Sequence, residues 1–289
     1  MTGGGNFGQR ALIFIFRHCN VRVGYAMMYF AMPFYLIFAG KARRASMHYF
    51  GWVYGYGFCK SLWKCWCSYI NFGKVILDRF AVFAGQKDRF QVEEDRMDLF
   101  NDLMTQPGGF MMVGSHTGNY EICGYLLRQD VKKIYTLVFG GEGEILQRQR
   151  NAQWVQNNVE MVPVADDMSH LFVINEALQE GGIVSMPADR LLGSSKSITC
   201  KFGQAVADFP VGPFSVAAIR RVPVLAVFVF RKATYRYKVI VRRIDADENI
   251  RQSKARAEAM AKEYVDLLYQ QVSENQCQWF NFFEFFRKE

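Results

Sequence analysis

From residue 91 onward, short apolar runs alternate with amphipathic segments. The runs have the length of buried strands, and the segments repeat apolar residues every three or four positions, as helices do. Strands alternating with helices predict an α/β fold, a mostly parallel sheet flanked by helices, in which 235–241 returns antiparallel to 222–230. The predicted strands are 110–114, 133–139, 161–164, 183–186, 222–230 and 235–241, and the predicted helices are 95–105, 119–127, 145–157, 169–179, 214–221 and 253–272.

The first 44 residues follow a different pattern, in which two apolar runs stand between basic residues. The second run, 23–40, has no charged residue over 18 positions, and Arg17, Arg22 and Lys41 lie near its ends. As a helix it would reach about 27 Å, the lower limit for crossing a bilayer. Basic residues on both sides give the positive-inside rule no preferred orientation. We therefore expect a retained membrane anchor that forms a hairpin, a re-entrant segment or an interfacial helix.

Residues 45–90 mix aromatic with basic residues, as in Tyr49, Phe50, Lys60, Trp63 and Lys64. This pattern predicts helices whose aromatic side chains either face lipid or pack in a core. The change of pattern near residue 90 predicts a membrane-associated helical region over 1–90 and an α/β domain over 91–289.

Composition and charge narrow the possible functions. The 289 residues are 51% hydrophobic and 21% charged, which excludes a disordered chain. Residues 1–90 hold 12 Lys/Arg and 2 Asp/Glu, a net charge of +10, whereas residues 91–289 hold 23 and 25, a net charge of −2. An excess of positive charge in the most apolar third favours an anionic membrane surface over nucleic acid as the partner.

Motifs for cofactors are missing from the sequence. The seven cysteines are odd in number and contain no C-x-x-C, and the C-x-C of Cys65 and Cys67 lacks a second ligand pair. Reduced thiols are therefore expected, and no metal. The sequence also has no G-x-G-x-x-G or P-loop, so no nucleotide cofactor is expected.

The strongest candidate chemistry lies in S-H-T-G-N-Y-E, residues 115–121, which follows a predicted strand. Ligands of open α/β sheets bind beyond the carboxyl ends of strands. If the chain turns sharply at Gly118, Glu121 can accept a hydrogen bond from one imidazole nitrogen of His116. The other nitrogen then remains free to act as a general base. The alternative is a histidine that caps a helix beside a surface glutamate.

Two further segments carry candidate binding groups. Asp189 and Arg190 follow the strand 183–186, and Arg190 can bind a phosphate in a bidentate manner, unless the two residues form only a surface ion pair. The Gly/Pro-rich turn that ends in Gly212 and Pro213 precedes a predicted helix, whose first N–H groups can bind an oxyanion or phosphate. Lys201, shortly before this turn, is a further candidate.

The motifs together resemble those of a known family. H-T-G-N-Y-E is similar to the H-x4-D/E motif of the glycerolipid acyltransferase superfamily. V-I-L-D-R-F-A at 75–81, K-F-G-Q-A at 201–205, F-P-V-G-P-F-S-V-A at 209–217 and the aromatic tail Q-W-F-N-F-F at 278–283 resemble the late (lauroyl/myristoyl) acyltransferases of bacterial lipid A biosynthesis. The resemblance covers nearly the whole chain in one order, including the apolar N-terminus.

This resemblance implies an O-acyltransferase at the cytoplasmic side of the inner membrane. It would transfer a fatty acyl chain from an acyl-carrier-protein or CoA thioester to a hydroxyl of a membrane lipid, with no cofactor. It implies that His116 is the base and Glu121 orients it, and that Asp189, Arg190, Asn119, Lys201, Gly212 and Pro213 bind substrate.

The chain departs from the family pattern at two positions, Val211 and Asn281. Val211 stands where related glycerol-phosphate acyltransferases have the glutamate of a Pro-Glu-Gly element. Asn281 stands where a large aromatic residue is common. The acceptor can therefore be a lipid A precursor or another glycolipid, an aminolipid or a pigment. A non-catalytic lipid-binding protein and a serine or cysteine hydrolase are the alternatives from other classes, although the sequence has no G-x-S-x-G elbow.

Overall fold

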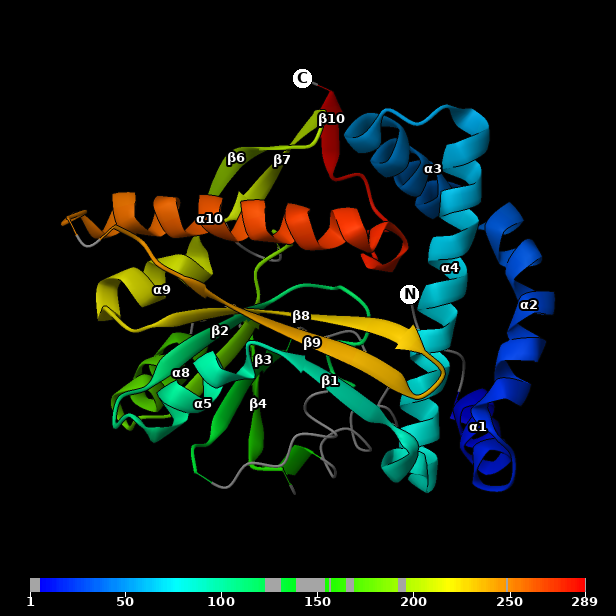
Figure 1. Cartoon of the computed structure of the whole chain (residues 1–289), viewed down its shortest axis with the longest axis horizontal. Helices are drawn as coiled ribbons and strands as arrows, with labels where there is room; N and C mark the ends of the chain where they lie inside the picture. The colour runs from blue at the N-terminus through cyan, green and yellow to red at the C-terminus, as the bar shows by residue number, and fades with distance from the viewer. Residues whose placement is uncertain are drawn as a thin grey trace.

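The structure is a computed structural model (Figure 1). At its centre lies a seven-stranded sheet. The structure describes residues 6–122, 131–138, 154–155, 157–164, 169–191, 196–247 and 249–288. The strand order is β1-β9-β8-β2-β5-β3-β4, and every neighbouring pair is parallel except β8–β9. The predicted α/β class and the mostly parallel sheet are thus confirmed.

Most predicted elements agree with the structure to within a few residues. The strands are β2 (Phe110–Gly114), β3 (Ile134–Val138), β4 (Val159–Pro163), β5 (Ile183–Pro187), β8 (Val224–Ala233) and β9 (Arg236–Ile244), and the helices are α5 (Met97–Thr105), α8 (His170–Gln179), α9 (Gly212–Arg220) and α10 (Ser253–Glu274). The predicted helix 145–157 and the end of 119–127 lie largely outside the described residues.

Helices cover both faces of the sheet, as burial of a parallel sheet requires. Side chains of α8, α9 and α10 form one apolar core with β2, β5 and β8, and side chains of α4 (Phe58–Ala81) and α5 form the other. Within α10, apolar positions such as Ala257, Ala261, Tyr264 and Leu268 recur at helical spacing and are buried, which explains why this helix was predictable.

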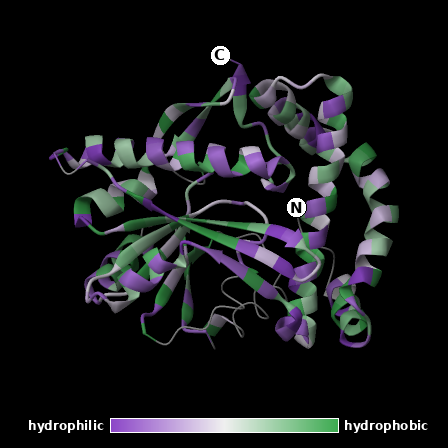
Figure 2. Cartoon of the chain, in the orientation of Figure 1, coloured by the Kyte–Doolittle hydropathy of each residue, from purple (hydrophilic) through white to green (hydrophobic). Residues whose placement is uncertain are grey.

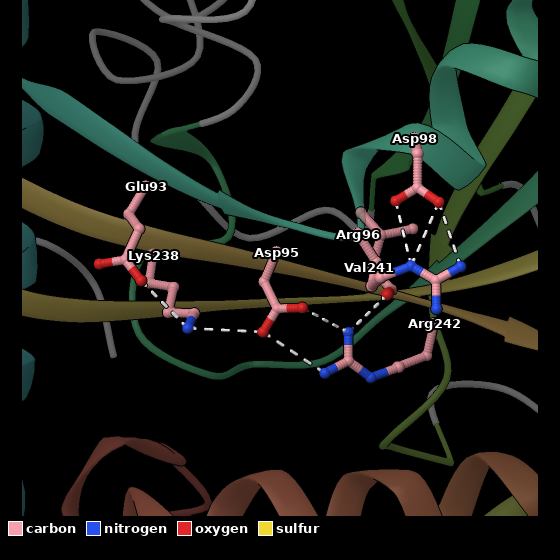
Figure 3. Close-up of polar contacts among 7 residues, drawn as sticks. All are labelled: Glu93, Asp95, Arg96, Asp98, Lys238, Val241 and Arg242. Carbon is pink, nitrogen blue, oxygen red and sulfur yellow. Dashed lines mark hydrogen bonds and ion pairs between the residues drawn. The ribbon is translucent and has the colours of Figure 1, made fainter.

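The strand β1 (Gln91–Asp95) was not predicted, because it has no apolar alternation. It pairs in parallel with β9 at the edge of the sheet, and ion pairs join the two strands (Figure 3). Lys238 of β9 contacts Glu93 at 3.1 Å and Asp95 at 3.4 Å, and Arg242 contacts Asp95 at 3.0 Å. Charged side chains on an edge strand also oppose pairing with another chain.

A second sheet, also not predicted, consists of β6 (Ser197–Phe202), β7 (Ala205–Pro210) and β10 (Phe286–Lys288). A tight turn with Gly203 at positive φ joins β6 to β7, and β10 adds the C-terminal tail to β7. The K-F-G segment is thus the end of a hairpin, packed through Phe202 against Trp279.

The N-terminal region forms helices α1 (Asn6–His18), α2 (Val21–Phe38) and α3 (Gly40–His48), followed by a π-helical turn over 49–53 and by α4. Of the described helices, α2 alone is long and apolar enough to cross a membrane, with 22% of it buried. In Figure 2 the ribbon of α2 is mostly green to white, because few of its residues are hydrophilic. Of the aromatic residues, Tyr49, Phe50 and Tyr69 pack in the core, whereas Phe58 and Trp63 are exposed. That the exposed ones face lipid stays a prediction. The domain division at residue 90 stays a prediction.

Candidate active site

Two neighbouring parallel strands bring the main candidate residues together. Gly114, the last residue of β2, is in register with Pro187, the last residue of β5. His116 and Asp189 each lie two residues beyond those strand ends, so both are at the carboxyl edge of the sheet where ligands of α/β proteins bind. The sequence placed each residue at a strand end, and the strand order makes them neighbours.

Asp189 holds His116 by two hydrogen bonds. The backbone N–H of His116 donates to Oδ2 at 2.8 Å, and the imidazole Nδ1 lies 2.8 Å from Oδ1. The indole Nε1 of Trp279 donates a third hydrogen bond to Oδ2, at 2.8 Å. Because the carboxylate can only accept, Nδ1 carries the proton in the neutral ring, and Nε2 is left as the acceptor that a base needs.

Asp189 is fully buried, yet its environment favours the ionised carboxylate. Burial alone would raise its pKa, but His116, Arg190 and Trp279 outweigh burial and lower the pKa to about 2. Because Asp189 is fully buried, the alternative of a surface Asp189–Arg190 pair is wrong. The carboxylate is a fixed negative charge that favours protonation of His116 during a reaction.

The expected contact between Glu121 and the His116 ring requires a correction. The carboxylate that contacts Nδ1 is Asp189, and Glu121 pairs instead with Arg79 of α4, whose Nε lies 2.9 Å from Glu121 Oε2. Glu121 is 1% exposed, so it is not a surface glutamate either. The reason for the difference is topological, since the neighbouring strand β5 delivers a carboxylate closer to the ring than the five-residue spacing does.

Gly118 allows the sharp turn between His116 and Glu121. Its φ is +46°, and a Cβ at this position would overlap the carbonyl oxygen of Val229 in β8. Any other residue would therefore displace the turn. Next to it, Thr117 and Asn119 are fully buried.

The C-terminal tail closes the other side of this turn. Gly118 donates its N–H to Gln278 O at 2.7 Å, Phe280 donates its N–H to His116 O at 3.0 Å, and Thr117 forms an isolated β-bridge with Trp279. The aromatic tail is thus part of the candidate site. Sequence comparison had singled out the tail, but no local pattern indicated the contact of Trp279 with Asp189 or that of Arg79 with Glu121.

The other predicted site residues occupy three different environments. Arg190 lies beside Asp189, donates from Nη2 to Phe280 O at 2.8 Å, and has a buried Nε without a hydrogen-bond partner among the described residues. Asn119 is packed near the Tyr237 hydroxyl. Lys201 is exposed on β6, and Gly212 and Pro213 form the first turn of α9. The hydrogen bonds of His116 and Asp189 reach neither Lys201 nor this turn.

Within the described ranges, no cluster of three His, Cys, Asp or Glu side chains suits a metal.

This arrangement, a His–carboxylate pair at adjacent strand ends of an α/β sheet, defines a class of site suited to proton transfer at a hydroxyl. A comparison with family models gives the particular family. The model for the bacterial lipid A biosynthesis acyltransferase family matches residues 67–288, and the chain therefore belongs to that family of acyltransferases. A search of curated proteins gave no match.

Proposed function

We propose that this protein transfers a fatty acyl chain from a thioester, of acyl carrier protein or CoA, to a hydroxyl of a membrane lipid similar to a lipid A precursor. Membership of the lipid A acyltransferase family supports the reaction type. The single observation that supports the mechanism most strongly is the bond from His116 Nδ1 to the buried, ionised Asp189. We place the reaction at the cytoplasmic face of the inner membrane.

His116 is the general base in this proposal, and Asp189 is its orienting partner. Nε2 removes the proton of the lipid hydroxyl as the hydroxyl oxygen attacks the thioester carbonyl. The tetrahedral intermediate then collapses, the carbon–sulfur bond breaks, and the proton passes from His116 to the thiolate. An ester and a free thiol result, so the atoms balance without a metal or nucleotide. General-base assistance of this kind contributes about 10²–10⁴ in rate.

Arg190 is the candidate for stabilising negative charge next to the base. Its Nε is a buried donor that has no partner among the residues described, and its Cζ lies over the ring of Phe283, 5.3 Å from the ring centre. An oxyanion or substrate phosphate would satisfy that donor. The Arg79–Glu121 ion pair fixes the other end of the turn that carries His116, which makes both residues positioning groups.

A different acceptor in the same reaction is the second candidate, because Asn281 departs from the aromatic tail of the family. Asn281 is buried, and neither its Nδ2 nor its Oδ1 has a partner within the described parts of the chain. A polar pair of this kind next to the site suits an acceptor with additional hydroxyl or amide groups, such as a glycolipid or an aminolipid. A non-catalytic lipid-binding protein would not need a hydrogen-bonded His–Asp pair.

The test is acyl transfer to a mixed lipid acceptor by purified full-length protein, with both acyl carrier protein and CoA donors. We expect ester formation, and we expect His116→Ala to lower kcat at least about 10²-fold with an unchanged circular dichroism spectrum. His170→Ala, at the start of α8, is the matched control and should stay within about twofold. Activity of His116→Ala within about threefold of the unmutated protein would remove the assignment of the base.

A further inference from the structure

One face of α2 is apolar and uncovered along the whole helix. Its outward side chains include Phe30, 79% exposed, and Phe38, 82% exposed, together with Met27, Phe34 and Ile37. Phe14 of α1 and Phe58 and Trp63 of α4 extend the exposed apolar set. We call the residues of α1 and α2 in this set the apolar face. Contiguous apolar surface of this kind marks an interaction site.

The opposite side of α2 is fixed to α4 by close packing. Gly24 lies against Phe16 and Leu77, and Gly73 of α4 lies against Met28 and Met32, at positions where a Cβ would force the Phe16 or Met28 side chain to shift. Polar contacts add to the packing. Tyr25 donates from its hydroxyl to the buried Asp78, and Arg231 of β8 donates from Nη2 to the Tyr25 hydroxyl at 3.0 Å. These contacts tie α2 to the central sheet.

This packing places α2 alongside α4, which lies between α2 and the sheet (Figure 1). Lys74 of α4 donates to the hydroxyl of Tyr29, in the middle of α2, at 2.9 Å. If α2 crossed a bilayer in this position, Lys74 and the neighbouring body would lie at the depth of the hydrocarbon, where each charged group is strongly disfavoured. If α2 left the body to cross alone, the buried Asp78 would lose the Tyr25 hydroxyl as a partner.

The charges around the apolar face match an anionic lipid surface. No acidic residue precedes Asp78 in the sequence, whereas Arg10, Arg17, Arg22, Lys41 and Arg44 are all exposed. A hollow of about 450 Å³ opens at the turn between α1 and α2, with Arg17, His18 and Arg89 on its wall beside a single acid, Asp88. Exposed aromatic side chains between basic groups are typical of helices that lie in the headgroup region.

We propose that α1 and α2 lie flat in the surface of an anionic bilayer, with the apolar face in the lipid and both ends of α2 on the same side of the membrane. This inference goes beyond the proposed reaction and does not depend on it. It selects the interfacial helix from the arrangements that the sequence left open, and it assigns the lipid surface, rather than a second copy of the chain, as the partner of the apolar face.

The first experiment labels both ends of α2 in sealed membrane vesicles from cells that produce the full chain. Native Cys19 precedes α2 and is exposed, and Lys41→Cys, in a Cys59→Ser background, introduces a thiol just after α2. A membrane-impermeant maleimide is added outside, and labelled peptides are quantified by mass spectrometry before and after detergent opens the vesicles. Lys254→Cys at the start of α10 reports the side on which the α/β body lies.

We expect the thiols at positions 19, 41 and 254 to be labelled from the same side of the membrane, each to the same fraction of the total measured after detergent is added. Labelling of the Lys41→Cys thiol from the side opposite to Cys19 would show that α2 crosses and would overturn the proposal. Recovery of the chain in the soluble fraction would overturn it as well.

The second experiment measures partition of the purified chain to vesicles that contain anionic phospholipid. Phe30→Gln combined with Phe34→Gln should weaken binding at least about tenfold, because two buried aromatic side chains are lost from the lipid. The matched control is Phe172→Gln in α8, where the side chain is equally exposed at 79%. Unchanged binding together with loss of a dimer in the Phe30/Phe34 variant would assign the face to a second copy and contradict the lipid assignment.

Discussion

Asp189 is the residue on which the geometry of the candidate site depends most. Three N–H donors converge on its two oxygens, two of them on Oδ2. A charge-assisted hydrogen bond is about twice as strong as a neutral one, so the carboxylate holds the His116 backbone, the imidazole and the Trp279 indole in one arrangement. A substitution that keeps its shape but not its charge therefore tests the tautomer of His116 directly.

We expect Asp189→Asn to lower kcat at least about 10²-fold while the protein stays folded. The amide oxygen would accept from the two donors at Oδ2, which leaves the NH₂ group opposite His116 Nδ1. That donor would favour the tautomer with the proton on Nε2, and Nε2 could no longer act as a base. Steady-state kinetics measure the loss, and nitrogen NMR of the histidine ring measures the tautomer. Retention of the Nδ1–H tautomer in an inactive variant would contradict this explanation.

The Arg79–Glu121 pair gives a second prediction at the same scale. Arg79→Met should destabilise the protein by about 3–5 kcal/mol, because it removes the positive charge that lies 2.9 Å from the buried Glu121 carboxylate. Adding Glu121→Gln should recover most of the loss. Urea unfolding of the two single variants and the double variant measures the coupling. The exposed pair of Arg243 and Asp245 is the control, and Arg243→Met should change stability by about 0.5 kcal/mol or less. Additive losses would show that the pair has no special role.

At the scale of elements, the turn over 115–121 determines where His116 lies. Gly118→Ala should lower stability by at least about 2 kcal/mol and reduce activity strongly, since the new Cβ meets the backbone of β8 and the φ of +46° is unfavourable for alanine. Gly108→Ala, where the Cβ would enter open space, is the matched control and should be nearly neutral. Thermal unfolding and acyl transfer measured on both variants distinguish a local displacement from general destabilisation. Equal behaviour of the two alanine variants would show that the turn tolerates the side chain.

The sequence predicted elements with an apolar period and missed those without one. The strand 110–114 and the helix starting at residue 253 agree with the structure, because burial on one or both faces selects apolar residues at regular positions. The edge strand β1 lies where charged residues are tolerated, so its sequence contains little strand signal. The hairpin of β6 and β7 has polar residues on its exposed positions, and its glycine turn suggested a loop instead.

The sequence predicted the individual residues of the site, but it did not predict that His116 contacts Asp189. The position of His116 and Asp189 after buried strands follows from local sequence. Their contact depends on β2 and β5 being neighbours, although the two residues are 73 positions apart in the chain. Spacing within one segment therefore favoured Glu121, the nearer carboxylate in sequence, over Asp189, the nearer one in space. The same reason explains why Arg79 and Trp279 were missed, since each reaches the site from another part of the chain.

On the scale of the whole molecule, the excess of positive charge lies in residues 1–90, and helices α1 and α2 also carry exposed apolar side chains. Most acidic residues lie in the α/β body. Because the exposed Arg17 and Arg22 lie at the turn between α1 and α2, we expect Arg17→Gln and Arg22→Gln each to weaken binding to anionic vesicles. A well-placed basic residue contributes about 1 kcal/mol, so each change should weaken binding roughly fivefold at low salt. Lys254→Gln in α10 is the control. The differences should shrink at high salt, and differences that persist there would indicate a contact other than the lipid charge.

The hydrogen bonds between the turn at 116–118 and residues 278–280 also set the order of events during synthesis. Strands β2 and β5 are made early, but Trp279 must be available before the carboxylate of Asp189 gains its third donor. Until residues 278–280 have been made and released, this pairing cannot form, and the N–H of Gly118 lacks the Gln278 carbonyl as its acceptor. Helices α1 and α2, which we propose to lie in the membrane surface, are made well before residues 278–280, so under that proposal the chain would reach the lipid before its site is complete.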